Sequence, residues 1–169
     1  MSLDARLSKA SAALGHLAAA PDGRAYLRSL ADVCAAAVAA DRCTLYLVDH
    51  RRAELRGSIT QGDPFEIVLP IGRGLAGHCA SSGETINVEN AYDDPRFDPT
   101  VDGRTGYRTK TTLVVPMWGV IDPARVIGVI QVLNKRDGTF EWSDQLLLER
   151  VAAAVGASVE RIARRRGTS

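Results

Sequence analysis

Long hydrophobic runs are absent from this sequence, and so is a strong net charge. The longest apolar stretch covers residues 30–40 and is interrupted by Asp32, so it is well below the roughly 20 residues that a membrane-spanning helix needs. The first residues do not have the pattern of a signal peptide. The 21 basic and 20 acidic residues leave a net charge of +1, which gives no long-range field to attract nucleic acid. We therefore expect neither a membrane nor a nucleic-acid partner.

Cysteine and histidine are scarce as well. There are three of each, namely Cys34, Cys43, Cys79, His16, His50 and His78. The cysteines have neither the paired spacing of a zinc site nor the even count of a disulfide framework. The histidines have no partner at the i, i+4 spacing of a zinc pair. We expect a cytoplasmic protein that is not an enzyme, with no metal site, no cofactor and no catalytic residue.

The length and composition are those of one globular domain. A chain of 169 residues buries roughly two-thirds of its unfolded surface, and a hydrophobic content of 46% supplies a core. We expect a domain over residues 21–163, a helix over residues 1–20, and a basic tail or truncated linker over residues 164–169. The three arginines 164–166 suit the end of a helix, where the macrodipole stabilises cations.

The first helix carries an apolar seam. Its members step by four, three, four and three residues: Leu3, Leu7, Ala10, Leu14 and Leu17. This spacing is typical of a short coiled coil and predicts a homodimer through the terminal helices. The alternative is a helix that packs on its own domain, because the seam is shorter than three heptads. The segment Pro21-Asp22-Gly23 ends the pattern, and helical spacing resumes over residues 25–40.

The middle of the chain reads as short strands joined by short loops, which favours an antiparallel sheet. The strands are expected over residues 43–48, 54–60, 66–69, 85–88, 112–118 and 126–133. Helices are expected over residues 74–82, ended by Gly83, and over 143–165, capped by Ser143. An antiparallel sheet flanked by helices gives an α+β sandwich.

Two segments of the middle region can hold a ligand. Residues 72–77 match G-x-G-x-x-G, but no parallel βαβ unit follows, which argues against a dinucleotide fold. The segment can still bind an anion, because the free backbone amides at the N-terminus of a helix attract negative charge. Residues 90–110 contain four Asp, two Pro and two Gly and have the length of a functional lid.

Several motifs resemble one family. The segment Asn134-Lys135 is followed by Phe140 and Asp144, with Gln145 where that family usually has Glu. Further matching segments are residues 42–49, 74–78, 87–92, 94–97 and 105–110. In this order they resemble the GAF domains of cyclic-nucleotide phosphodiesterases and adenylate cyclases. The resemblance implies a small-molecule sensor in signal transduction, with an output domain outside this chain, and a structural Lys135–Asp144 pair that ties down the lid.

The resemblance also implies ligand contacts, and it points to cyclic AMP or cyclic GMP. The matching positions are Thr44, Ile59, Leu75, Ala76, Asp102, Thr105, Thr109 and Gln131. Backbone amides at Leu75 and Ala76 would hold the cyclic phosphate, and Asp102 would read the base. Residues 59–61 lack the aromatic and acidic pair of guanine-selective relatives, which weakens the case for guanine.

Other interpretations stay open at this point. Thr44 also suits a strand, Asp102 suits a turn, and Gln131 suits a sheet position bonded within the fold. The clustered cysteines with which some GAF proteins reduce methionine sulfoxide have no match here. The alternatives for the whole chain are a ligand-free dimerisation module and a GAF pocket for another metabolite.

Overall fold

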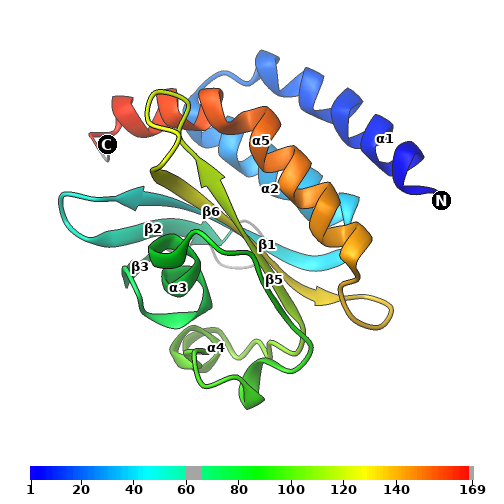
Figure 1. The fold of residues 1–169 in the computed structure, drawn as a ribbon, viewed down its shortest axis with the longest axis vertical. Helices are drawn as coiled ribbons and strands as arrows, with labels where there is room; N and C mark the ends of the chain where they lie inside the picture. Colours follow the sequence, from blue (N-terminus) through cyan, green and yellow to red (C-terminus); the bar gives the residue numbers. More distant parts are fainter. Residues whose placement is uncertain (60–65, 168–169) are drawn as a thin grey trace.

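A six-stranded antiparallel sheet forms the centre of the fold, in the order β3-β2-β1-β6-β5-β4 (Figure 1). The computed structural model describes residues 1–59 and 66–167, with only the backbone of residues 58 and 59. The strands are β1 (Ala40–Asp49), β2 (Glu54–Ile59), β3 (Glu66–Pro70), β4 (Ile86–Val88), β5 (Thr112–Trp118) and β6 (Val126–Lys135). The predicted α+β class and antiparallel sheet are confirmed.

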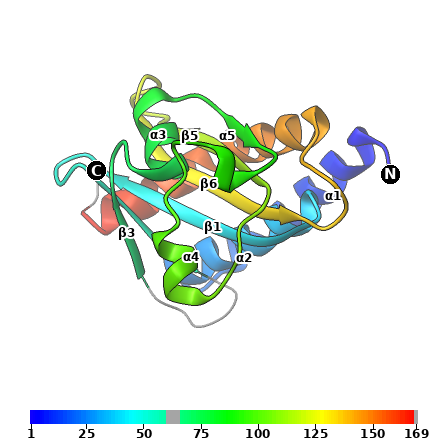
Figure 2. The ribbon, with the colours of Figure 1, turned by 90° about the horizontal axis from the view of Figure 1, so that it is seen from below.

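Helices cover both faces of this sheet. One face carries α1 (Leu3–His16), the short turn η1 (Leu17–Ala19), α2 (Gly23–Ala37) and α5 (Trp142–Arg165). The other face carries α3 (Gly74–Ser82), η2 (Ala91–Asp93) and α4 (Thr100–Thr105). Figure 2 shows α3 and α4 in front of the sheet, with α1, α2 and α5 behind it. Both faces of β1 are therefore covered, which explains why nearly all of its residues are buried rather than every second one.

Side-chain alternation along β1 and β6 assigns residues to the two faces. Leu45 and Ile130 pack in the core under α2 and α5, whereas Tyr46 and Val129 pack in the core under α3. Because successive side chains of a strand point to opposite faces, Thr44 and Gln131 share the side of Tyr46 and Val129. The residues predicted for the ligand therefore lie on the face that carries α3 and α4.

Helix α1 packs on its own domain. The seam residues Ala10 of α1 and Leu17 of η1 are buried in the helical core, and Leu3, Leu7 and Leu14 are partly buried against the same core, where α1 contacts α2 and α5. The alternative interpretation of the seam, a helix that packs on its own domain, is the one that the structure supports, because α2 and α5 cover these leucines. Self-association of the chain stays a prediction without support from this seam.

Helix α5 begins earlier than the sequence indicated. Its N-cap is Glu141, and a capping box joins Glu141 to Asp144: the Glu141 amide donates to Asp144 Oδ2 at 2.9 Å. The prediction that Ser143 caps the helix is wrong, since Ser143 lies inside the first turn and its hydroxyl accepts from Arg6 Nη1 at 3.3 Å.

A tight backbone contact fixes the start of α3. The Gly72 amide donates to the Gly77 carbonyl at 2.9 Å. A Cβ on Gly77 would lie 2.9 Å from the Pro70 carbonyl oxygen, so only glycine fits there. Gly74 has φ of +68°, a left-handed conformation that glycine adopts without strain. This geometry sets the N-terminus of α3 against the lid.

The described residues form no helix with the length and apolar character that crossing a bilayer requires.

Candidate functional site

A small pocket lies between the sheet, α3 and the segment 90–110, which we call the lid. Its volume is about 60 Å³. Seven of the eight residues predicted from the sequence line it, namely Thr44, Leu75, Ala76, Asp102, Thr105, Thr109 and Gln131. The eighth, Ile59, pairs through its backbone with Thr44, but its side chain lies outside the described part of the chain. The sequence prediction thus selected residues that the fold brings together.

Neighbouring strands form the polar floor of this pocket. Thr44 of β1 and Gln131 of β6 are register partners, and Arg42 lies two residues before Thr44 on the same face of β1. Among the residues that the structure describes, the side chains of Thr44 and Gln131 have no hydrogen-bond partner. The hydroxyl and the amide are therefore available to a ligand, and the amide both donates and accepts.

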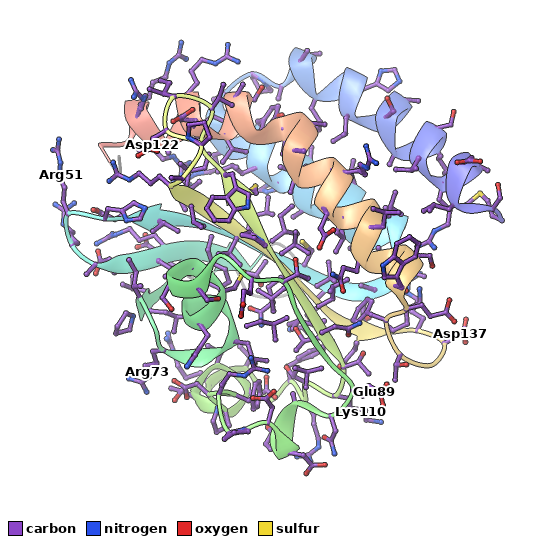
Figure 3. All side chains as sticks on the ribbon, in the orientation of Figure 1. Arg51, Arg73, Glu89, Lys110, Asp122 and Asp137 are labelled. Atoms are coloured by element: carbon purple, nitrogen blue, oxygen red, sulfur yellow. The ribbon has the colours of Figure 1, made fainter. Side chains whose placement is uncertain are left out.

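The N-terminus of α3 closes one end of the pocket. The first amides of a helix have no partner within the helix, and here they belong to Leu75 and Ala76 in the pocket wall. Arg73, labelled in Figure 3, is the N-cap residue of α3. It pairs with Asp98 of the lid, with Nε 2.6 Å from Oδ2. Bonds from the Thr100 hydroxyl and amide and from Arg73 hold the pKa of Asp98 below its usual range. The lid thus carries one paired carboxylate next to the anion-attracting helix end.

Inside the lid, Asp102 holds the backbone together. The Thr109 amide and hydroxyl donate to its two carboxylate oxygens at 2.7 and 2.8 Å, and the Tyr92 hydroxyl donates at 3.0 Å. Asp102 is only 8% exposed. The Thr105 hydroxyl donates to the Val101 carbonyl at 2.9 Å. The predicted lid contacts are therefore used within the lid, and Asp102 can read a base only by exchanging these bonds.

Removing Asp102 is expected to loosen the lid rather than change ligand preference. Asp102→Ala leaves the Thr109 amide and hydroxyl without their acceptor, and each unsatisfied buried group costs about 1–3 kcal/mol. If the domain binds the cyclic nucleotides that the resemblance implies, the affinities for cyclic AMP and cyclic GMP should fall together, with the ratio of the two Kd values unchanged in calorimetric titrations. Thr105→Ala, which removes one bond to a carbonyl, is the matched control with a smaller effect. A changed ratio in Asp102→Ala would restore the base-reading role.

Tyr107 joins the lid to the sheet, although sequence reasoning gave it no role. Its hydroxyl donates to Asp41 Oδ2 at 2.8 Å and accepts from Asn134 Nδ2 at 2.9 Å. The Arg42 guanidinium lies 3.8 Å from the centre of its ring. Burial and the Asp41 carboxylate raise the pKa of Tyr107, so its hydroxyl stays protonated. An aromatic residue in a polar lid was the signal in the sequence that could have indicated this contact.

The signature at the end of β6 divides between the two faces of the sheet. Asn134 bonds to the lid: its Oδ1 accepts from the Lys110 amide at 2.6 Å and its Nδ2 donates to the Arg108 carbonyl at 2.9 Å. Lys135 Nζ donates to Asp144 at 2.9 and 3.0 Å on the helical face. Phe140 is buried in the helical core. Within the described chain, the Lys135–Asp144 pair makes no bond to the lid, so Asn134 holds the lid instead.

The cysteines lie away from the pocket. Cys34 and Cys43 belong to the helical core and Cys79 to the core under α3, and all three are buried. Burial raises the pKa of Cys43 and raises that of Cys79 to about 12, which disfavours the reactive thiolate. The described residues contain no group of three or more His, Cys, Asp or Glu side chains placed to hold a metal ion.

Comparison with known proteins identifies the family. Residues 22–159 match the sequence profile described as "GAF domain". The chain is 38% identical over 136 residues to a Caenorhabditis elegans protein named "Probable 3',5'-cyclic phosphodiesterase pde-5". This match covers 72% of this chain and 18% of that protein. The chain is 32% identical over 139 residues to the "Dual 3',5'-cyclic-AMP and -GMP phosphodiesterase 11A" of Takifugu rubripes, covering 72% of this chain and 15% of that protein. The chain thus spans less than a fifth of the length of these relatives.

Solved structures show the same fold. The GAF domain of an Acinetobacter phosphoenolpyruvate-protein phosphotransferase superposes with a TM-score of 0.81 at 22% identity, covering 100% of both chains. The free methionine-R-sulfoxide reductase of Neisseria meningitidis, in complex with its substrate, superposes with a TM-score of 0.72 at 24% identity, covering 93% of this chain and 89% of that one. The sequence match extends over most of the chain, and the chain belongs to the GAF family of small-molecule-binding regulatory domains.

Proposed function

We propose that this domain binds a purine cyclic nucleotide between the floor of the pocket and the N-terminus of α3, with the lid closed over it. One observation carries the proposal: the first amides of α3 line the same pocket as the side chains of Thr44 and Gln131. Backbone amides at a helix N-terminus suit the cyclic phosphate, and an amide side chain suits the edge of a base. The two relatives named as cyclic-nucleotide phosphodiesterases support the same ligand class.

The size of the pocket requires the lid to move. A cavity of about 60 Å³ is well below the roughly 300–1,000 Å³ of ligand pockets. A nucleotide therefore enters only after the lid has opened, and the lid closes again around it. Ligand shifts such an equilibrium by its difference in affinity between the two lid positions. This shift is the regulatory signal that an attached output domain would receive.

The proposed role is binding rather than catalysis. A reductase that uses cysteine needs an accessible thiolate, whereas the three thiols here are buried in the two cores. Among the described residues that line the pocket there is no cysteine. We therefore propose a sensor without enzymatic activity of its own.

Calorimetric titration and thermal melts with cyclic AMP and cyclic GMP test this function. A ligand at about 100 times its Kd should stabilise the fold by roughly 2.7 kcal/mol. Linear 5'-AMP and 5'-GMP are the matched controls, since they keep the base and open the phosphate ring. Gln131→Ala should weaken binding about 3- to 10-fold, as expected for one lost hydrogen bond. The absence of heat and stabilisation with either nucleotide at millimolar concentration would contradict the proposal. It would leave another metabolite or a ligand-free dimerisation module, which ultracentrifugation would detect as a dimer.

A further inference from the structure

Two consecutive residues at the end of β6 direct their side chains to opposite faces of the sheet. Asn134 makes its side-chain bonds to the lid, and Lys135 makes its bonds to the helical layer. The backbone between them is fixed: the Asn134 amide donates to the Thr111 carbonyl at 2.7 Å, and the Lys135 amide donates to the Thr111 hydroxyl at 2.8 Å. Asn134 has φ of +54°, a left-handed conformation that asparagine tolerates. The side chains of this dipeptide therefore cannot move independently of its backbone.

On the lid side, the side chain of Asn134 bonds to three residues near the C-terminal end of the lid. It accepts from the Lys110 amide at 2.6 Å and donates to the Arg108 carbonyl and to the Tyr107 hydroxyl, each at 2.9 Å. Figure 3 shows Lys110 near the point where β6 leaves the sheet. Opening of the lid at this end breaks these bonds, because all three partners belong to the segment that has to move.

On the helical side, Lys135 meets a carboxylate shared with α1. Lys135 Nζ donates to both oxygens of Asp144 and, at 2.8 Å, to the Val38 carbonyl after α2. Arg6 of α1 donates to Asp144 Oδ1 as well, and its Nη2 also donates to the Ala37 carbonyl at 3.1 Å. Asp144 is 1% exposed, whereas Lys135 and Arg6 are each 15% exposed. A buried carboxylate is stable only while cations balance its charge. If Lys135 is displaced, Arg6 has to balance the charge of Asp144 alone.

We propose that the Asn134-Lys135 dipeptide couples the position of the lid to the docking of helix α1, through Asp144 and Arg6. The part played by ligand rests on the proposed function, but the coupling itself is a property of the unliganded fold. Coupling between two equilibria is reciprocal, so undocking of α1 must favour opening of the lid by the same free energy by which opening of the lid favours undocking of α1. Helix α1 is then the element that reports whether the lid is closed.

Hydrogen exchange of the unliganded protein, followed by mass spectrometry, tests the coupling from the α1 side. Arg6→Ala should speed exchange in lid peptides over residues 100–110 by about fivefold or more, the lower range for allosteric coupling. Lys9→Ala removes another cation of the same helix, one that is exposed, and should leave the lid unchanged. Arg6→Lys keeps the charge toward Asp144 and should retain most of the lid protection. If α1 exchanges faster in Arg6→Ala while the lid stays at the wild-type rate, the coupling is refuted.

The reverse variant tests reciprocity. Asn134→Gly removes the bonds to the lid and suits the left-handed backbone, so it isolates the side chain. It should speed exchange in the lid and also in α1. An effect confined to the lid would overturn the proposal. Since neither measurement uses a nucleotide, failure of the cyclic-nucleotide titrations would leave this result intact, and failure here would leave a positive titration intact.

Discussion

Asp144→Ala is expected to lower the free energy of unfolding by about 3–5 kcal/mol, the usual cost of removing one partner from a buried ion pair. Asp144 is 1% exposed and accepts from Lys135, from Arg6 and from the Glu141 amide. Alanine leaves the two cations without their shared carboxylate and the capping amide without its acceptor, and it separates the end of β6 from the start of α5. Urea denaturation at pH 7 measures the loss.

The matched control is an ion pair at the surface. Glu66→Ala removes a 60% exposed carboxylate that lies 3.4 Å from Arg56, and exposed pairs contribute about 0–1 kcal/mol. Equal losses in the two variants would show that Asp144 acts as an ordinary surface charge, against its burial.

The pH dependence of this loss follows from the pKa of Asp144. Burial raises that pKa, but the Glu141 amide, Lys135 and Arg6 together hold it below its usual value. A carboxylate with a lowered pKa stabilises the fold above the unfolded pKa of about 3.9, and this contribution is lost as the pH falls through the folded value. The difference in the free energy of unfolding between wild type and Asp144→Ala should therefore be largest at neutral pH and shrink below about pH 4. Other paired carboxylates, such as Asp49, are common to both proteins and cancel in this difference.

Most of the fold could be predicted because its signals are local. Strand β5 was predicted with its observed bounds, and α3 was predicted from Gly74 to Ser82 with Gly83 as its left-handed C-cap. Local patterns gave wrong predictions where contacts between distant residues determine how a helix packs or where it begins. The seam of α1 has the same spacing whether it faces a second chain or α2 and α5, and only the tertiary packing distinguishes the two. The predicted N-cap of α5 is Ser143, whereas the observed N-cap is Glu141. Glu141 forms a capping box with Asp144, which is held by Lys135 and Arg6 from other elements.

The residues predicted to contact a ligand lie around one pocket, but the hydrogen bonds of their side chains were not predicted. The resemblance selected pocket residues such as Thr44 and Gln131, yet it could not show which of them are already bonded. Asp102 is used inside the lid because Thr109 folds back onto it, a contact across seven residues with no signal in the spacing. Asn134 and Lys135 are adjacent in sequence but act on opposite faces of the sheet, so the lid contact was assigned to the wrong neighbour.

Gly74→Val is expected to abolish the cyclic-nucleotide binding that we propose. Gly74 has φ of +68°, where a side chain costs about 1–2 kcal/mol and a β-branched one more. A Cβ there would lie 3.6 Å from Asp98 Cβ, so the added methyl groups fill the gap between the lid and the start of α3. The amides of Leu75 and Ala76 would then be closed to the phosphate. Calorimetric titration should show no heat at millimolar nucleotide.

Gly138→Val separates lost binding from lost stability. Gly138 lies between β6 and α5 and has φ of +82°, so valine introduces comparable backbone strain, but its Cβ would have no atom within 4 Å and the residue does not line the ligand pocket. Both variants should melt a few degrees below wild type, at roughly 2–4 °C per kcal/mol for a chain of this size. Gly138→Val should still bind with a Kd near that of wild type. If Gly74→Val binds as tightly as Gly138→Val, the phosphate is not held at the start of α3, and the cation of Arg42 at the floor becomes the alternative anchor for the ligand's charge.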